Sequence, residues 1–96
     1  MKILALEREV KQVKHDGFHP YLLDEAAKVY EFYLSGIIRE FYFHKMDHTA
    51  VLIMECSDTN EAQKVLNSLP LVKAGLITFD LIPLVPYSGF NRLFKV

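Results

Sequence analysis

The chain has 96 residues, and 11 Lys and Arg against 12 Asp and Glu give it a formal net charge of −1. This length allows one domain rather than two, and the balanced charge lacks the basic excess typical of nucleic-acid-binding proteins. Hydrophobic residues make up 51% of the chain, which excludes a disordered protein, and the single Cys excludes a disulfide framework within one chain.

The sequence shows no sign of a membrane segment or a secretory leader. No stretch approaches the ~20 apolar residues that a membrane-spanning helix needs. In residues 1–8 charge returns after a few apolar positions, whereas a secretory signal needs a longer apolar core and a cleavage site of small residues. We therefore expect a cytoplasmic protein with no membrane partner, in which Cys56 stays reduced.

The first third of the chain predicts a strand followed by a helix. Residues 2–8 are apolar and bounded by charge, which is typical of a short strand, and the polar residues 9–19 indicate a loop. Pro20 suits the first position of a helix, and Gly36 is a natural stop. Apolar residues recur at helical spacing between them, so we expect a helix over 20–34.

The middle of the chain predicts a hairpin, a second helix and a last strand. Residues 37–44 and 49–56 are rich in β-branched and aromatic side chains, which favours two antiparallel strands joined by a turn. Asp58 resembles the first residue of a capping box, and Pro70 ends the helix that follows. Residues 76–82 give the fourth strand.

The predicted order βαββαβ is that of the ferredoxin-like α+β fold, a four-stranded antiparallel sheet with both helices on one face. We expect residues 1–96 to form a single domain. Residues 83–96 contain two prolines and a glycine and are expected to form a C-terminal arm. This arrangement leaves the second face of the sheet open.

Strand alternation predicts which side chains share the open face. Ile37, Phe41 and Phe43 are assigned to the helix side. The residues assigned to the open face are Ala5, Glu7, Ile38, Glu40, Tyr42, His44, Thr49, Val51, Ile53, Glu55, Thr78, Asp80 and Ile82. Such an apolar patch is unfavourable on a monomer, so we expect a second copy to cover it. The result would be a homodimer or higher oligomer with one pocket per chain for a small hydrophobic ligand.

Several short motifs resemble a known family. The pair Asp24-Glu25 ahead of Gly36, the hairpin, Ser68-Leu69-Pro70-Leu71 and Leu81-Ile82-Pro83-Leu84 are similar to the muconolactone isomerase family of the dimeric α+β barrel superfamily. The resemblance implies this fold and an enzyme that moves a proton within an unsaturated lactone without a metal or organic cofactor. Glu25 matches the position of a carboxylate discussed as the base of that reaction.

The sequence also departs from the pattern of this family. Ile38 and Tyr42 stand where the family has tryptophans, Arg39 is kept, and His44 follows two residues after Tyr42. The family's His-Pro-Ser ending is replaced by Tyr87-Ser88-Gly89. These changes point away from the lactone substrate and toward a separate subfamily.

The candidate catalytic residues are Glu25, Tyr42 and His44. Because a carboxylate in a dry pocket has its pKa raised, Glu25 is either a general base or an acid that stabilises the start of its helix. Tyr42 and His44 either orient and protonate a ligand or lie at a solvent-exposed strand end.

The candidate ligand-binding residues are Arg39, Glu40, Val51, Ile53 and Asp80. Glu40 and Asp80 would form an acid/base pair if they approach across the sheet, and otherwise each would pair with a basic residue. The four histidines lack the regular spacing of a zinc site, so we expect no metal and no cofactor.

Three functions remain open at this stage. The first is a cofactor-free isomerase or proton-transfer enzyme acting on a small hydrophobic acid, lactone or quinone-like compound. The second is a non-catalytic binding module for an apolar metabolite, and the third is a structural or assembly protein. An unbroken apolar cavity with no paired acid and base would favour the second function over the first, and a cavity filled by side chains would favour the third.

Overall fold

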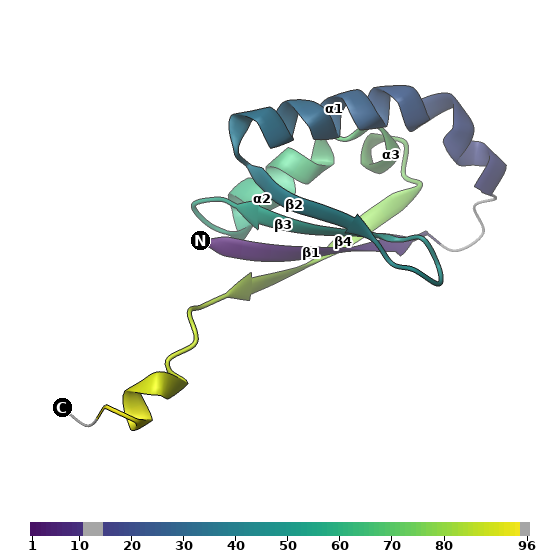
Figure 1. Ribbon diagram of the computed structural model, residues 1–96. Coiled ribbons are helices and arrows are strands. Elements are labelled where there is room, and N and C mark those ends of the chain that lie inside the picture. Colours follow the sequence, from purple (N-terminus) through teal and green to yellow (C-terminus); the bar gives the residue numbers. More distant parts are fainter. Residues whose placement is uncertain (11–14, 95–96) are drawn as a thin grey trace.

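The computed structural model describes residues 1–10 and 15–94 of the chain. Its elements are β1 (Lys2–Glu9), η1 (His15–Tyr21), α1 (Leu22–Ser35), β2 (Ile38–Phe43), β3 (Ala50–Glu55), α2 (Thr59–Asn67), α3 (Pro70–Lys73), β4 (Ile77–Leu84) and η2 (Gly89–Arg92). The four strands form one antiparallel sheet in the order β2-β3-β1-β4, and the α-helices cover one of its faces (Figure 1). This arrangement confirms the predicted ferredoxin-like fold.

Two short helices differ from the prediction. Part of the predicted 9–19 loop is the 3₁₀ helix η1, which runs into α1, while residues 11–14 of that loop lie outside the described residues. Pro70 not only follows α2 but also begins α3, since Leu69 before it is extended. Proline suits this first position because its missing N–H would have no helical partner there.

The position of a β-bulge in β2 corrects one face assignment. Ile38 pairs with Met54, but Glu40 pairs with Ile53, so Arg39 is an extra residue that shifts the alternation. Ile38 therefore lies on the helix side and is fully buried, and its assignment to the open face was wrong. Beyond the bulge Glu40 and Tyr42 face away from the helices, as expected.

The alternation of β1 is the reverse of the one predicted. Ala5 pairs with the core residue Leu52 and is fully buried, and Glu7, two residues on, lies on the same face and is only 8% exposed. Leu4 and Leu6 take the open face instead. The assignment of Ala5 and Glu7 to the open face was wrong because both alternating rows of this strand are apolar, so the pattern alone could not choose between them.

The core lies between the sheet and the layer formed by α2 and α3. Its largest fully buried side chains are Ile3, Ile38, Met54, Leu66, Leu69 and Ile77. α2 contributes two buried residues and α3 one, whereas α1 contributes none. The long helix α1 is therefore held over the sheet without filling the space beneath it.

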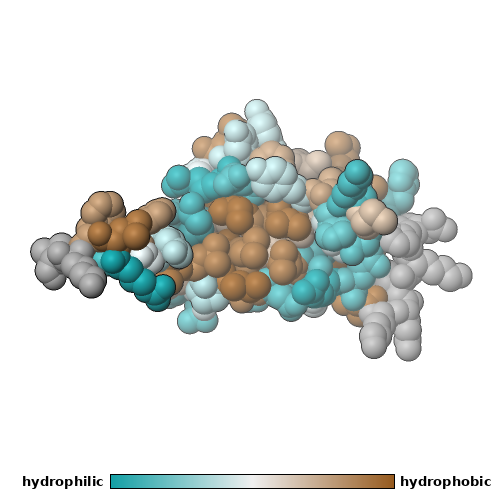
Figure 2. All heavy atoms as spheres, turned by 60° about the horizontal axis from the view of Figure 1, so that its bottom comes forward, coloured by the Kyte–Doolittle hydropathy of each residue, from teal (hydrophilic) through white to brown (hydrophobic). Residues whose placement is uncertain are grey.

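The open face of the sheet carries an apolar patch, which we define as Leu4, Leu6, Val51, Ile53 and Ile82. Figure 2 shows this open-face patch as a hydrophobic area with hydrophilic residues around it. After β4 the chain leaves the domain as an arm that ends in η2, far from the helices (Figure 1). Within the described residues, no helix is long and apolar enough to cross a membrane.

Candidate functional site

A cavity of about 880 Å³ lies between α1 and the helix-facing side of the sheet. This volume is within the range of small-molecule sites, ~300–1,000 Å³. Most of its walls are apolar, and the residues that give them this character include Leu22, Ala26, Val29, Phe41, Leu52 and Phe79. The sequence predicts a pocket on the open face, but this cavity lies on the opposite face of the sheet, beneath α1.

Glu25 lies in this cavity wall, in the first turn of α1. Its Oε1 accepts a hydrogen bond of 2.9 Å from the backbone N–H of Leu71, near the start of α3. Burial raises the pKa of Glu25, the hydrogen bond opposes this shift, and the charge of Glu7 adds to it. The raised pKa of Glu25 therefore comes from burial in the cavity wall and from the nearby charge of Glu7, and not from its position in α1.

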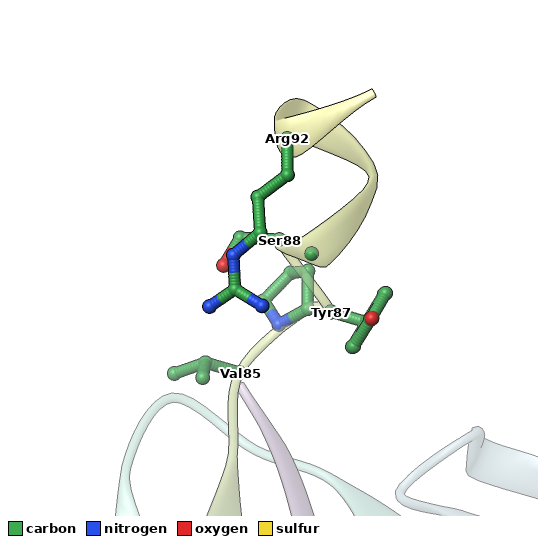
Figure 3. Close-up of a pocket in the computed structure, with 6 residues that line it drawn as sticks. Val85, Tyr87, Ser88 and Arg92 are labelled. Atoms are coloured by element: carbon green, nitrogen blue, oxygen red, sulfur yellow. The ribbon is translucent and has the colours of Figure 1, made fainter. Parts of the chain in front are cut away.

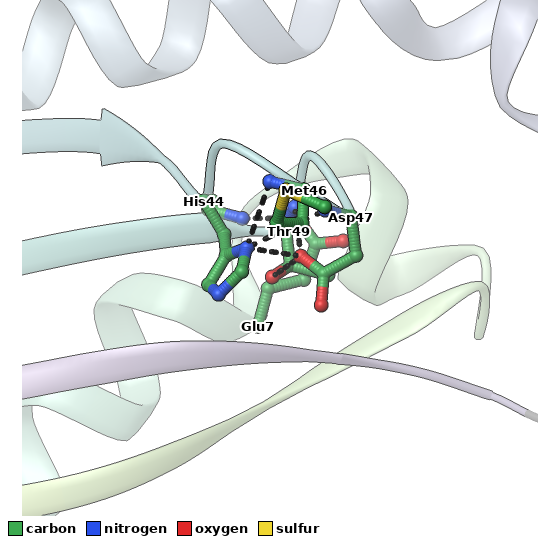
Figure 4. A network of polar contacts seen from close by, with 6 residues as sticks. Glu7, His44, Met46, Asp47 and Thr49 are labelled. Carbon is green, nitrogen blue, oxygen red and sulfur yellow. Dashed lines mark hydrogen bonds and ion pairs between the residues drawn. The ribbon is translucent and has the colours of Figure 1, made fainter.

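Glu7 is a second carboxylate in the cavity wall and was not among the predicted site residues. Its Oε1 accepts a hydrogen bond of 3.1 Å from the backbone N–H of Ala50 (Figure 4). Burial is also the main reason why the pKa of Glu7 is raised. In the sequence, Glu7 continues the alternating row that contains Ile3 and Ala5. This pattern would have indicated a cavity residue only with that row assigned to the helix side of β1.

Each of these two carboxylates has one oxygen that accepts a hydrogen bond and one that accepts none from the described residues. Within the described part of the chain, Glu7 and Glu25 each make the single backbone hydrogen bond given above, through Oε1. No buried side-chain oxygen of the described residues lacks a hydrogen-bond partner, so the two Oε2 atoms, which have none, are accessible. These oxygens are therefore acceptors for a hydrogen bond or a proton from a molecule in the cavity.

The β2–β3 turn brings a histidine to the cavity, His48. Its imidazole stacks on the ring of Phe43, with 4.1 Å between the ring centroids. The backbone of His48 has φ of 62°, an uncommon conformation for a residue with a side chain. His48, like Glu7, is not among the candidate site residues predicted from the sequence.

His44 holds the same turn together and lies outside the cavity wall. Its Nδ1 accepts a hydrogen bond of 3.1 Å from the backbone N–H of Met46 and lies 3.3 Å from Oδ1 of Asp47 (Figure 4). A nitrogen that accepts is unprotonated, so the contact with Asp47 becomes an ion pair only if His44 gives up its bond with Met46.

Tyr42 contributes to the cavity wall, but alternation turns its side chain to the open face. There its hydroxyl donates a hydrogen bond of 2.7 Å to Oε1 of Glu40. This bond to a carboxylate raises the pKa of Tyr42. Of the three predicted catalytic residues, the structure therefore brings only Glu25 to the cavity with its polar atoms exposed to it.

The predicted ligand-binding residues lie elsewhere. Arg39 donates to the backbone oxygen of Gly36, and Asp80 forms an ion pair of 2.6 Å with Arg8 on the open face. Glu40 and Asp80 are not brought together, since β2 and β4 are the two edges of the sheet, about 14 Å apart at the usual strand spacing. Val51 and Ile53 belong to the open-face patch. A ligand role for these five residues stays a prediction.

A smaller hollow of about 400 Å³ lies on the arm (Figure 3). The residues that line it include Val85, Tyr87, Ser88 and Arg92. The rings of Tyr87 and Phe90 meet edge to face, with 5.2 Å between their centroids. This hollow is formed by the arm folding on itself. Among the described residues, no group of three His, Cys, Asp or Glu side chains is arranged to hold a metal ion.

Comparison with solved structures shows which proteins share this architecture. Muconolactone isomerase matches 92% of this chain and 92% of its own, with a TM-score of 0.72 and 12% sequence identity. The chain has the muconolactone isomerase fold. The dehydrochlorinase of 5-chloro-2-hydroxyhydroquinone, TftG from Burkholderia phenoliruptrix AC1100, matches 93% of this chain and 98% of its own, with a TM-score of 0.70 and 16% identity. No protein-family model and no curated protein matches the sequence.

These matches confirm, at the level of the fold, the resemblance found in the sequence. The structure of TftG is a complex with 2,5-dihydroxybenzoquinone, a small ring compound. Both comparisons cover nearly all of the chain, so the fold is shared over almost its whole length.

Proposed function

We propose that this protein is a cofactor-free proton-transfer enzyme, an isomerase or lyase that acts on a small ring compound in the cavity beneath α1. The observation that carries the proposal is a pair of carboxylates, the buried Glu7 and the partly buried Glu25, each with an unused oxygen in a mostly apolar cavity. The names of the two proteins that share the fold, an isomerase and a dehydrochlorinase, support the same reaction class.

The reaction would begin with removal of a proton from a ring carbon next to a carbonyl group. Oε2 of Glu25 takes this proton, the C–H electron pair moves into the ring, and an enolate forms. In an isomerisation the proton returns to another carbon, whereas in an elimination the electron pair expels a leaving group. A carboxylate whose pKa is raised toward neutrality is a better base for this step than an exposed one.

Glu7 has a different part in this proposal. Its charge raises the pKa of Glu25, so the two carboxyls share one negatively charged region and are protonated in succession. While one accepts the substrate proton, the other accepts a hydrogen bond from the substrate.

We also propose that the enzyme works as a cytoplasmic homodimer or higher oligomer. A second copy would cover the open-face patch, and the arm presents further apolar groups, among them Tyr87 and Phe90, which are 75% and 64% exposed. Neither surface takes part in the cavity itself, so the dimer would support the fold and not supply the base.

The activity can be tested with a panel of lactones and hydroxyquinones followed by ultraviolet absorption. Glu25→Gln keeps the acceptor for Leu71 but cannot take a proton, so we expect its kcat to fall by about 10²–10⁴. Glu31→Gln, an exposed acid of the same helix, is the matched control and should not change kcat. Absence of turnover by the parent protein across the panel would refute the proposal.

One observation favours a second function, the non-catalytic binding of an apolar metabolite. Both carboxylates accept backbone hydrogen bonds, so each has a structural role that needs no reaction. Binding of panel compounds without turnover would select this function.

A further inference from the structure

The charge of the cavity restricts what it can bind. Four of the described residues that line it are acids, namely Glu7, Glu9, Glu25 and Asp47, and none of the described lining residues is a Lys or Arg. His48 is the one described lining residue that can gain a positive charge. Among the described lining residues, an anion entering this space would meet carboxylates and no permanent cation.

Three of the basic residues that lie near the wall in sequence make contacts elsewhere. Arg8 follows Glu7 but lies on the open face, where Asp80 pairs with it. Lys28, on α1, contacts Glu31 and lies 5.3 Å from the ring centroid of Phe32. Arg39 is bound to a backbone oxygen at the end of α1. These contacts leave none of the three as a receptor for an anion in the cavity.

The polar atoms that remain available in the cavity are acceptors. Oε2 of Glu7 and Oε2 of Glu25 have no partner within the described chain, and a carboxylate in partly dry surroundings is stabilised by a hydrogen-bond donor. A second carboxylate, from a ligand, would offer no donor and would add like charge where water screens it poorly. The apolar remainder of the wall favours a flat hydrocarbon body.

We infer that the cavity selects an uncharged ring compound with hydroxyl groups that donate to Glu7 and Glu25, and that it rejects the corresponding carboxylates. This inference rests on the proposed function for the location of the site and narrows the substrate class. Of the compounds considered from the sequence, it keeps a quinone-like compound that bears hydroxyl groups and discards the hydrophobic acid.

The inference is tested by equilibrium binding, without any turnover, using calorimetry or ligand-observed NMR at millimolar ligand concentrations. The probes are hydroquinone, 1,4-dimethoxybenzene, 2,5-dihydroxybenzoate and 4-(aminomethyl)phenol. We expect hydroquinone to bind at least tenfold more tightly than the dimethoxy compound, which lacks donors, and than the benzoate, which is an anion. In a Glu7→Gln/Glu25→Gln double variant, the difference between hydroquinone and the benzoate should fall below threefold.

Three controls accompany this measurement. Glu31→Gln should bind all four probes as the parent does, and thermal unfolding should show that the double variant is folded. Lys11 and Lys14 lie outside the described residues, so a Lys11→Ala/Lys14→Ala variant is included. It should leave the order of affinities unchanged.

Several outcomes would overturn the inference. These are binding of the benzoate as tight as that of hydroquinone, tighter binding of the amine, or no binding of hydroquinone. Turnover of carboxylated substrates would refute the inference and leave the proposed function standing. Selective hydroquinone binding without turnover of any panel compound would do the reverse.

Discussion

Glu7 and Glu25 show how two residues far apart in the sequence come to act on one another. Each is anchored by a backbone N–H, from Ala50 and Leu71 respectively, and these bonds hold the carboxyls at the cavity. Burial then raises the pKa of both. The hydrogen bonds that position the two carboxyls oppose this rise, so burial gives the proposed base its greater proton affinity.

These raised pKa values predict a pH-dependent stability. Between the ordinary value of 4.5 and the higher value in the folded protein, the folded state binds more protons than the unfolded state. The free energy of unfolding contributed by these groups is thus greatest at low pH and is lost as pH rises through the folded pKa. In the Glu7→Gln/Glu25→Gln variant this loss should be absent.

Urea unfolding of parent and double variant from pH 4 to 8 measures the effect. The stability of the variant relative to the parent should increase with pH and then level off. The difference between the two proteins is the relevant quantity, because Asp47 and Glu55 have lowered pKa values and act in the opposite direction in both. A difference that is constant with pH would contradict the prediction.

His44 gives a second prediction at the scale of one residue. Because its Nδ1 accepts from the backbone of the β2–β3 turn, we expect His44→Ala to lower the free energy of unfolding by about 0.5–1.5 kcal/mol. We expect kcat to change by less than threefold, in contrast to Glu25→Gln. A hundredfold loss of kcat with unchanged stability would restore the catalytic role predicted from the sequence.

At the scale of elements, the two long helices differ in what they bury. α2 is anchored by Ala62 and Leu66, whereas α1 has no buried residue and forms the roof of the cavity. A small protein with half of its residues apolar would gain stability by filling this space. The open space beneath α1 is therefore the feature of the fold that most strongly indicates a ligand.

This difference predicts unequal effects of truncating the two helices. Leu66→Ala should lower the free energy of unfolding by about 2–5 kcal/mol, as for a filled core. Val29→Ala, facing the cavity, should lower it by about 1 kcal/mol or less, because space already exists beside it. Denaturant unfolding of the two variants checks this, and equal losses would mean that the cavity is closed in solution.

At the scale of the whole molecule, the apolar residues have two destinations. One is the core between the sheet and its helices, and the other is the open-face patch together with the exposed aromatic residues of the arm (Figures 1 and 2). A chain of this size covers only the first of these by itself.

The dimer prediction belongs at this scale. Light scattering at micromolar concentration should give at least twice the chain mass of 11.1 kDa. Ile53→Lys, within the patch, should shift the protein to a monomer, since a charge would be buried in the interface. Leu34→Lys, on the exposed side of α1, is the matched control. A monomeric parent would refute the prediction.

Local patterns in the sequence were sufficient for the order of the elements. Helical spacing, the cap at Asp58 and the stop at Gly36 act over a few residues, and the structure confirms each: Oδ1 of Asp58 accepts from the N–H of Glu61, and Gly36 has φ of 85°. Glu25 was a candidate base because it matches the position of a carboxylate in the family that the sequence resembles, and its place in the first turn of α1 was the structural alternative.

The faces of two strands were decided only by tertiary structure. In β1 the rows Ile3-Ala5 and Leu4-Leu6 are both apolar, so only the pairing of Ala5 with Leu52 shows which row meets the helices. In β2 the bulge at Arg39 reverses the alternation, and no local pattern marks it. These long-range pairings turn Glu7 toward the cavity, and for that reason the second carboxylate of the site could not be read from the sequence.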